Sequence, residues 1–224
     1  MWLVTMCTVK DIREQFKALY GSSMFNASGL LEIVGASFIA DEESIFGKVD
    51  YAYVDKEIAW YNSKSRNVYD MHNPPKIWQA VATPDGRINS NYGWCIYSDD
   101  NFNQYYKVLH TLQKNPNSRQ GTMIYTRPSM HEDSCEDGMK DFMCTNAVTY
   151  FIRECPISKV DQIHCVVQMR SNDAVYGYKN DYAWQKYVLT KLGAALGVGL
   201  GDIHWQVASL HIYPRHFNLL EDLQ

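Results

Sequence analysis

The 224-residue sequence lacks several features that would assign it to a common class of protein. No two of its six cysteines are spaced C-x-x-C, and none lies near a histidine at zinc-ligand spacing, so we expect no metal. This pattern predicts free thiols in a reducing, cytoplasmic setting. No apolar run approaches the roughly 18 residues typical of a membrane span, and the first residues lack a basic leader, so we expect neither membrane insertion nor a signal peptide.

Positive charge is also scarce, because 21 Lys and Arg face 25 Asp and Glu, for a net charge of −4. This balance argues against a nucleic-acid surface that neutralises phosphates, although a mononucleotide needs only a few local donors. The H-x-E and P-C-x-x-C pattern of zinc deaminases is missing, as are G-x-G-x-x-G and the P-loop. Tyrosine, by contrast, occurs 16 times, and buried tyrosines need partners for their hydroxyls. We therefore expect a polar-lined cavity or a large aromatic interface.

The apolar pattern predicts one α+β domain over residues 1–224, with a mixed or mostly antiparallel sheet and helices packed on it. Thr8 is the expected N-cap of the first helix, and Gly21 its stop. We find no internal repeat, low-complexity tract or linker. Helices are predicted within residues 8–23, 54–65, 99–116 and 181–202, a buried strand within 30–40, and further strands within 121–127, 147–154, 163–171 and 205–216.

Two residues could carry covalent or proton chemistry. Cys144 enters an apolar strand, where an inert core thiol is the common finding. As a nucleophile it would need a lowered pKa from nearby cations, for which Arg119, Arg127 and Arg170 are candidates. Glu57 lies beside an apolar helical face, where it is either a solvated surface residue or a carboxyl pushed into a pocket, with a raised pKa suited to proton transfer.

Other residues could bind a phosphate or a sugar. Arg119 stands in a turn, as a surface arginine or as a guanidinium that clamps phosphate oxygens. His211 and Tyr213 lie two apart on a strand and could contact a sugar hydroxyl, although buried structural residues would look the same. Residues 170–181 crowd polar side chains after a strand, as a solvated turn or as a pocket that binds a small ligand. Each of these signals is weak alone.

Eight segments occur in an order that resembles the thymidylate synthase superfamily and, within it, most of all the bacteriophage dCMP hydroxymethylases. They are "GASFIADE", "KIWQ", "INSNYGW", "MIYTRPSM", "DFMCTN", "MRSND", "NDYAWQKYVL" and "SLHIYPRH". The resemblance implies a thymidylate synthase-like fold and a homodimer formed through the sheet. It also implies transfer of a one-carbon unit from 5,10-methylenetetrahydrofolate to C5 of a pyrimidine nucleotide.

The resemblance implies roles residue by residue. Cys144 matches the nucleophile that adds to pyrimidine C6, and Glu57 matches the glutamate that organises proton transfer and water. Arg119 matches an arginine that reaches the phosphate across the dimer interface. The remaining matches are Arg170 and Ser171 for the phosphate, His211 and Tyr213 for the ribose, Tyr92 and Asn172 in the nucleotide site, Asp173 for the pterin, Trp78 beside the folate, and Gly177 for close approach of the folate.

Asp181 matches the residue that binds the base, which is asparagine in thymidylate synthases. An asparagine amide suits the N3–H and O4 of uracil, whereas a carboxylate can accept from the cytosine amino group and from a protonated N3. Asp181 therefore indicates dCMP over dUMP, unless the match slips by one place to Asn180. The chain also departs from the family at Gln120, where a second phosphate-binding arginine is usual, and at Thr145, where thymidylate synthases have histidine. Its C-terminal segment is shorter than in its relatives.

The resemblance predicts that dCMP, methylenetetrahydrofolate and water give 5-hydroxymethyl-dCMP, for modified phage DNA in an infected host cell. Three alternatives stay open. A dCMP 5-methyltransferase would use the same residues with hydride in place of water, and a dUMP-directed enzyme is disfavoured by Asp181. A catalytically silent nucleotide-binding protein is disfavoured by Cys144, Glu57 and Arg170. We expect no direct nucleic-acid partner.

Overall fold

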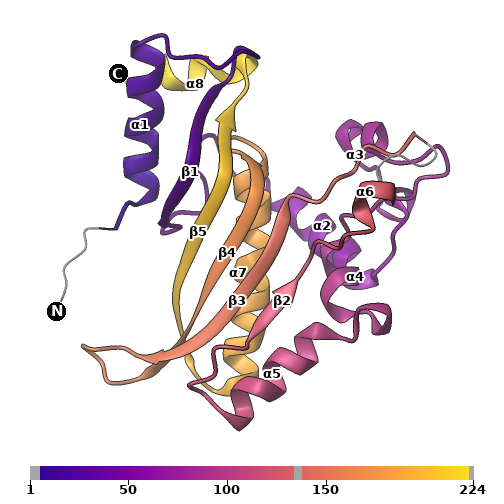
Figure 1. Cartoon of the computed structure of the whole chain (residues 1–224), viewed down its shortest axis with the longest axis vertical. Coiled ribbons are helices and arrows are strands. Elements are labelled where there is room, and N and C mark those ends of the chain that lie inside the picture. The colour runs from indigo at the N-terminus through magenta and orange to yellow at the C-terminus, as the bar shows by residue number, and fades with distance from the viewer. Residues whose placement is uncertain (1–5, 134–137, 222–224) are drawn as a thin grey trace. The chain divides into compact units, whose positions relative to one another are not determined.

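The computed structural model describes residues 6–133 and 138–221 of the chain (Figure 1). The chain divides into two compact units, one formed by Met1–Val49 with Ile152–Gln224 and the other by Asp50–Phe151. Each unit is described separately below. The expectation of a single domain over residues 1–224 stays a prediction.

The first unit is built on a mixed sheet. Its strands β1 (Leu31–Ile39), β5 (Gly199–Ile212) and β4 (Asp161–Asp173) lie in the order β1-β5-β4. β1 is antiparallel to β5, whereas β4 is parallel to β5. The α+β class and the mixed sheet are thereby confirmed. β1 is only partly buried, because Leu31, Ala36 and Phe38 are buried whereas Val34 is 79% exposed, so the expectation of a buried strand was wrong in part.

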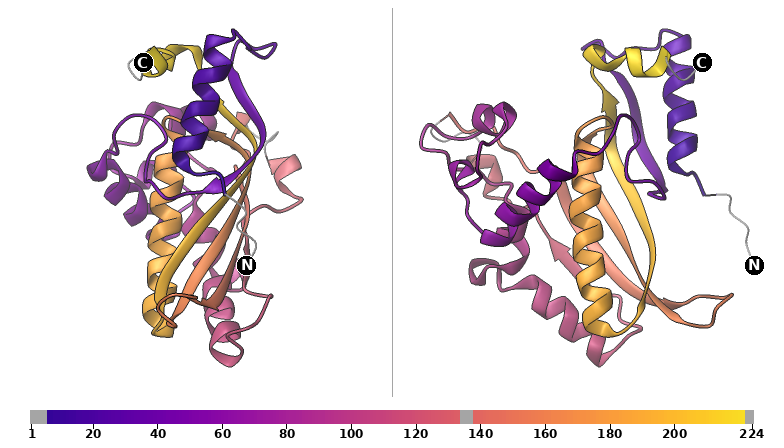
Figure 2. Two further views of the ribbon diagram at one scale, coloured as in Figure 1. Left: turned by 90° about the vertical axis from the view of Figure 1, so that its left-hand side faces the viewer. Right: turned by 180° about the vertical axis from the view of Figure 1, so that it is seen from behind.

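Helix α7 (Gly177–Leu196) connects the parallel strands β4 and β5 and covers one face of them (Figures 1 and 2). Parallel strands require such a crossover, because a short hairpin cannot join them. The buried side of α7 carries large apolar residues, and its Tyr178 ring meets that of Trp205 in β5 at a centroid distance of 5.2 Å. This packing fixes the start of α7 against the sheet.

Helix α1 (Val9–Gly21) begins and ends as the sequence predicts. Thr8 forms a capping box with Asp11, in which each side chain accepts a hydrogen bond from the other residue's backbone N–H. Val9, Ile12 and Phe16 form its buried side, and the helix packs against β1. The first unit also contains η4 (Pro214–His216) and α8 (Asn218–Glu221).

The second unit consists mainly of short helices. Gly93 is required by a close approach between α2 and α4, because a Cβ there would lie 1.8 Å from the Tyr61 carbonyl oxygen. β2 pairs with β3 in antiparallel register, and the last residues of β3 belong to the first unit. The elements are α2 (Tyr51–Ser63), η1 (Val68–Asp70), α3 (Lys76–Val81), α4 (Tyr92–Tyr97), η2 (Asp99–Asn101), α5 (Gln104–Lys114), β2 (Thr122–Ile124), α6 (Met130–Asp133) and β3 (Thr145–Glu154).

Several sequence-based boundaries were wrong. The helix expected within 181–202 begins earlier, at Gly177, and ends at Leu196, where Gly197 adopts a left-handed φ of 69° and caps it. Residues 199–202 instead open β5. The helix expected within 99–116 breaks because Phe102 and Asn103 both have positive φ, and Asn103 caps α5. The strand expected within 121–127 has only three residues, and α3 and α4 were not expected.

Among the helices that the structure describes, none has both the length and the apolar composition to cross a membrane.

Candidate active site

Glu57 is buried in the second unit, with 5% of its surface exposed. Tyr53, one helical turn earlier on α2, donates its hydroxyl to Glu57 Oε1 at 2.5 Å. Trp78 Nε1 of α3 donates to the Tyr53 oxygen at 3.0 Å and to Oε1 at 3.3 Å. Burial raises the pKa of Glu57 to about 7, although both hydrogen bonds lower it. The reading of Glu57 as a solvated surface glutamate was therefore wrong.

The raised pKa of Glu57 predicts a pH-dependent stability. The folded protein holds a proton up to about pH 7 that the unfolded chain releases near its ordinary pKa of 4.5. The contribution of Glu57 to the stability of the fold is therefore complete below pH 4.5 and is lost as the pH rises through the folded-state pKa of about 7. In the wild type, the free energy of unfolding should fall by about 3 kcal/mol between the pKa of 4.5 and the pKa of about 7. We expect this fall to be missing in Glu57→Gln.

Urea unfolding at several pH values checks this expectation. Glu132→Gln, at an exposed glutamate of the same unit, is the matched control and should keep the wild-type pH slope. An unchanged slope in Glu57→Gln would show that Glu57 titrates normally in the folded protein.

Cys144 is a half-buried cysteine outside any disulfide among the described residues, and it lies directly before β3. Its neighbour Thr145 is fully buried and donates its hydroxyl to the Tyr92 oxygen at 3.0 Å. Tyr92, buried at the start of α4, stacks on Tyr61 at a centroid distance of 5.2 Å. Cys144 is more exposed than the core residue Cys95, which is 2% exposed. Burial raises the pKa of Cys95 to about 12.

Asp141 holds the segment that leads to Cys144. This buried carboxylate accepts hydrogen bonds from the backbone N–H groups of Asn89 and Ser90, at 2.7 Å each, and from the Ser90 hydroxyl at 2.6 Å. Three donors satisfy the buried charge, so residues before the thiol are tied to the segment before α4. Nothing in the sequence indicated this anchor.

Arg119 lies in an exposed turn between α5 and β2. The turn is closed by Ser118, whose N–H donates to the Asn115 carbonyl at 2.9 Å and whose hydroxyl accepts from Gln120 N at 3.1 Å. Among the described residues, the Arg119 guanidinium makes no hydrogen bond or ion pair. The structure therefore gives it no role inside the second unit.

The end of β4 in the first unit carries the polar run that the sequence singled out. Arg170 is exposed, Ser171 is half-buried and paired with Ser209 of β5, and Asn172 is buried with 3% exposure. Asp173 Oδ1 accepts the Val175 N–H at 2.9 Å, which shapes the turn into α7. The segment is therefore an ordered corner between strand and helix rather than a solvated turn.

Asp181 lies one turn after the start of α7, and Asn172 Nδ2 donates to its Oδ2 at 2.8 Å. Gly177 faces the same pair, because a Cβ there would lie 2.9 Å from Asn172 Nδ2 and 3.8 Å from Asp181 Oδ2. The glycine is thus explained by packing within the unit. Its expected part in folate binding stays a prediction.

His211 and Tyr213 lie together at the end of β5. His211 is 7% exposed and pairs with Asp173 of β4, and Tyr213 follows the strand directly. Their rings meet edge to face at a centroid distance of 5.1 Å. In the first unit, Asp173 and Asp181 therefore lie at the corner between β4 and α7. His211, at the end of β5, is paired with Asp173.

The family model described as Thymidylate synthase matches residues 46–224, which is more than half of the chain. The chain belongs to the thymidylate synthase family. Members of this family use methylenetetrahydrofolate.

Known proteins resemble this thymidylate synthase family member to different degrees. It is 54% identical over 199 residues to the "Deoxycytidylate 5-hydroxymethyltransferase" of Enterobacteria phage T4, covering 85% of this chain and 78% of the relative, with the same values for phage T2. It is 24% identical to a thymidylate synthase of Francisella philomiragia, covering 78% of this chain and 66% of that one. The solved thermostable thymidylate synthase A of Bacillus subtilis shares the fold, with a TM-score of 0.68, 20% identity, and 94% and 82% of the two chains covered.

The second unit of this family member also contains an arginine pair that sequence reasoning missed. Arg66 and Arg127 both donate to Asn89 Oδ1, at 2.8 and 2.6 Å, and both lie over the Trp94 ring. Arg127 also pairs with Asp133 at 2.7 Å. Arg127, a candidate for activating Cys144, is thus already engaged in a structural network. Burial is the main cause that lowers the pKa of Arg66.

Two histidines and one aspartate of the first unit lie close enough to raise the question of a metal. The ligand atoms of His164, Asp202 and His204 lie within 4.8 Å of one another. However, His164 Nδ1 already accepts the Asp202 backbone N–H at 2.9 Å, and the Asp202 side chain is exposed. A hydrogen-bonded pair explains this contact without a metal, and the expectation of no metal stays a prediction.

Proposed function

We propose that the protein converts dCMP, 5,10-methylenetetrahydrofolate and water into 5-hydroxymethyl-dCMP and tetrahydrofolate, for modified phage DNA in an infected host cell. The observation that carries the proposal is the carboxylate of Asp181, which Asn172 orients at the start of α7. The 54% identity to phage deoxycytidylate 5-hydroxymethyltransferases supports it.

Asp181 is proposed to bind the base. Cytosine presents an amino group at N4 and, when N3 is protonated, a second N–H beside it. A carboxylate can accept both in one plane, and its charge stabilises the protonated ring. Protonation at N3 also draws electrons from C6, so the same contact favours attack at that carbon. Uracil offers a carbonyl oxygen at O4, which a carboxylate repels.

Cys144 is proposed to be the nucleophile. Its thiolate adds to C6 of dCMP, and the displaced electron pair makes C5 nucleophilic. C5 then forms a bond to the one-carbon unit that methylenetetrahydrofolate supplies. Covalent addition thereby divides a difficult substitution at an unactivated ring carbon into easier steps. The position of Cys144 before β3 suits this role, because Thr145 and the Asp141 anchor hold the backbone on both sides of the thiol.

Glu57 is proposed to handle the proton and the water. Loss of the C5 proton and release of tetrahydrofolate leave an exocyclic methylene on the cysteine-bound ring. Water adds to this methylene and loses a proton, C6–S cleavage follows, and the thiolate is regenerated as aromaticity returns. A carboxyl with a pKa of about 7 can exist in both protonation states near neutral pH, as such a relay requires.

The residues proposed for folate fit a flat, partly apolar ligand. On α3, Trp78 is half-buried and its neighbour Ile77 is 67% exposed, so an indole ring and an aliphatic side chain are both available for packing. In the first unit, Asp173 uses Oδ1 for the Val175 N–H, and a carboxylate can accept from the N–H groups of a pterin. Gly177 is proposed to allow the folate to approach the start of α7 closely.

The phosphate and the ribose are assigned to polar residues at the strand ends. Arg170 and Ser171 supply a guanidinium and a hydroxyl at the end of β4, as a phosphate needs. His211 and Tyr213 at the end of β5 are proposed to bind the ribose. Tyr92 of the second unit, whose hydroxyl oxygen accepts from Thr145, is also proposed to contact the nucleotide.

One assay tests the proposal. The protein is incubated with methylenetetrahydrofolate and either dCMP or dUMP, and the nucleotide product is identified by mass. A gain of CH₂O on dCMP supports hydroxymethylation. A gain of CH₂ with formation of dihydrofolate would show a methyltransferase instead, and no product with either nucleotide would indicate a silent binding protein.

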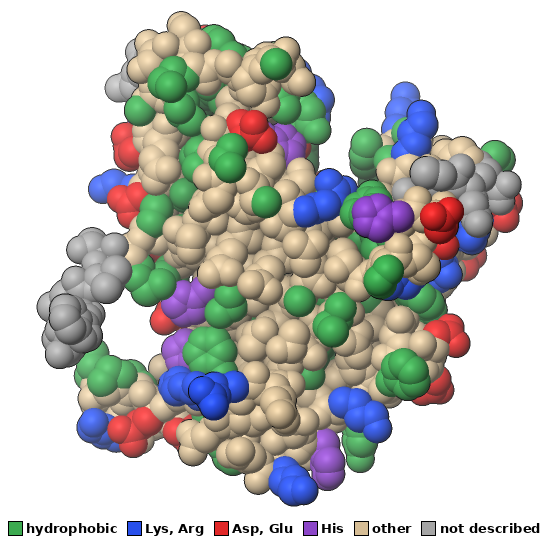
Figure 3. Space-filling view, in the orientation of Figure 1, with side chains coloured by type: hydrophobic (Ala, Val, Ile, Leu, Met, Phe, Trp, Pro, Cys, Tyr) green, Lys and Arg blue, Asp and Glu red, His purple; other side chains and the backbone are tan. Residues whose placement is uncertain are grey.

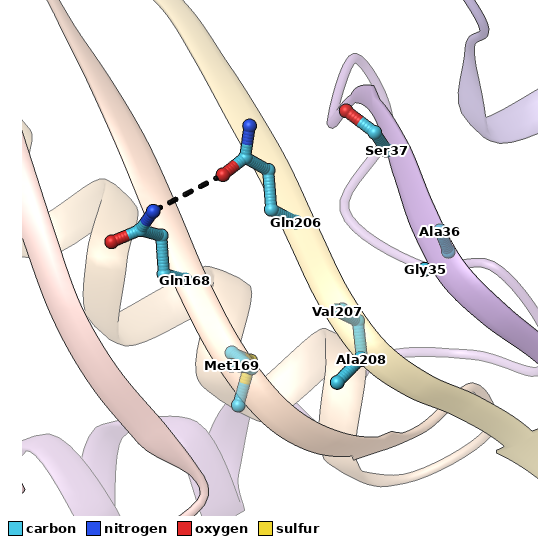
Figure 4. A pocket seen from close by; sticks show the side chains of 8 residues that line it. All are labelled: Gly35, Ala36, Ser37, Gln168, Met169, Gln206, Val207 and Ala208. Carbon is cyan, nitrogen blue, oxygen red and sulfur yellow. Dashed lines mark hydrogen bonds between the residues drawn. The ribbon is translucent and has the colours of Figure 1, made fainter.

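A homodimer is proposed to form through the sheet face opposite α7. In the space-filling view, the middle of this face over β4 and β5 is mostly uncharged (Figure 3). Gln168 and Gln206 are hydrogen-bonded at 3.3 Å on it (Figure 4), and Val34 of β1 is 79% exposed. A shallow hollow of about 370 Å³ there is lined by Gly35, Ala36, Ser37, Gln168, Met169, Gln206, Val207 and Ala208.

Arg119 is proposed to bind the phosphate of the partner's site. Purified mixed dimers of Cys144→Ser and Arg119→Glu should then show about half of the wild-type activity per dimer, since each mixed dimer has one intact site out of two. Subunits carrying two different tags are exchanged in mild denaturant, and the mixed dimers are purified through both tags. Inactive mixed dimers would place Arg119 in its own subunit's site, and a failure to form any dimer would reject the homodimer.

A further inference from the structure

Asn172 is a buried amide whose two polar atoms have different surroundings. Its side chain is 3% exposed, and Nδ2 donates to the Asp181 carboxylate at 2.8 Å. Its Oδ1 is also buried, but has no hydrogen-bond partner among the residues that the structure describes. The large majority of buried side-chain polar atoms in proteins have a hydrogen-bond partner, so this acceptor requires an explanation.

The contact with Asp181 fixes which way the amide of Asn172 points. A flipped amide would place Oδ1 against a carboxylate oxygen and would replace a charge-assisted hydrogen bond by a repulsion between two acceptors. Oδ1 is therefore held as a pure acceptor beside the base-binding carboxylate. A ligand with an N–H at this position would satisfy it.

Gly177 keeps the amide in place. A Cβ at residue 177 would lie 2.9 Å from Asn172 Nδ2, closer than real Cβ contacts, whereas Asp173 and Asp181 would be at ordinary distances. The helix gains nothing from glycine here, because Gly177 does not have a positive φ. The residue thus serves the close approach of Asn172 to the first turn of α7.

We propose that Asn172 is a second residue that distinguishes cytosine from uracil. Through Nδ2 it positions the Asp181 carboxylate, and through Oδ1 it accepts the N–H of the cytosine amino group that Asp181 leaves unbound. Both hydrogens of that amino group are then satisfied, and the O4 atom of uracil would face two acceptors. This inference rests on the proposed function and adds a specificity determinant to it.

The test compares dCMP and dUMP in Asn172→Leu, which keeps the size of the side chain and removes both polar atoms. Affinities are measured by calorimetry without folate, and kcat/KM is measured with folate. We expect the preference for dCMP over dUMP to fall about ten- to a hundredfold in both measurements, mainly through weaker use of dCMP. If Asn172 had only a structural role, the substitution would lower the affinity and kcat/KM for both nucleotides equally.

Two further variants keep the test decisive. Gly177→Ala retains Asn172 but pushes on its amide, so the preference should fall in the same direction even if Asn172→Leu does not fold. Gln185→Leu is the matched control, because Gln185 is a fully buried amide on α7 with no hydrogen-bond partner among the described residues. Its preference should equal that of the wild type.

The outcomes separate this inference from the proposed function. A wild-type protein that hydroxymethylates dCMP, together with an unchanged preference in Asn172→Leu and Gly177→Ala, would overturn the inference alone. A wild-type protein without turnover would reject the proposed function, and the calorimetric preference would then decide the inference: an unchanged ratio in both variants overturns it, and a reduced ratio supports it.

Discussion

Cys144→Ser is expected to abolish turnover while leaving nucleotide binding intact. A serine hydroxyl is ionised to a negligible extent near neutral pH and is a far weaker nucleophile than a thiolate, so C6 of the pyrimidine would no longer be attacked. We expect kcat to fall about 10⁴-fold or more, since loss of a covalent nucleophile has effects of this size. The affinity for dCMP measured by calorimetry should change little, because serine has the same shape as cysteine and is slightly smaller, so it does not obstruct the nucleotide.

Cys155→Ser is the matched control for Cys144→Ser. Cys155 is also a half-buried free thiol, and hydrogen bonding to Ser158 is the main cause that lowers its pKa. A lowered pKa makes Cys155 a candidate nucleophile on thiol reactivity alone. We expect Cys155→Ser to keep full activity, and retention of more than about a tenth of kcat in Cys144→Ser would remove Cys144 from the mechanism.

The sequence predicts the elements best where local chemistry determines them. Thr8 and the apolar spacing after it are sufficient to place α1, because the capping box and the buried side of this helix are local features. The glycine-rich residues 197–201 misled the prediction, since glycine fits both a helix stop and a strand. Residues 199–201 form a strand because β5 pairs with β4, and such a long-range contact leaves no pattern in the local sequence.

The candidate site was predictable as a set of residues but not as a set of contacts. The resemblance identified Glu57 and Asp181, and the residues alone left Glu57 between a solvated and a buried position. Its burial depends on Tyr53 and Trp78, and Trp78 comes from a helix that the sequence did not indicate. Likewise, the bond from Asn172 to Asp181 joins a strand end to a helix start, and no spacing rule reports it.

Asp181→Asn is expected to reverse the nucleotide preference. The neutral amide cannot stabilise a cytosine protonated at N3, and it offers a donor to O4 of uracil together with an acceptor for N3–H. Sites built to hydrogen-bond a polar group reject the wrong partner by large factors, so we expect the dCMP-to-dUMP ratio of kcat/KM to fall about a thousandfold. Parallel assays with both nucleotides, with products identified by mass, measure this ratio.

Asn180→Ala is the control that tests the alternative in which the base contact lies one place earlier. Successive residues on a helix point about 100° apart, and it is Asp181 that bonds to Asn172, so Asn180 should leave the preference unchanged. A preference that follows Asn180 and ignores Asp181 would overturn the assignment.

The double variant Asn172→Leu with Asp181→Asn links the two base-binding residues. In Asp181→Asn alone, Asn172 Oδ1 still faces the O4 position, or its amide turns over once the carboxylate no longer fixes it. Leucine removes the acceptor in either case, so the double variant should use dUMP at least as well as Asp181→Asn does. The effects of the two substitutions on the preference should also fail to add, because each residue orients the other. Additive effects would mean that Asp181 distinguishes the bases without Asn172.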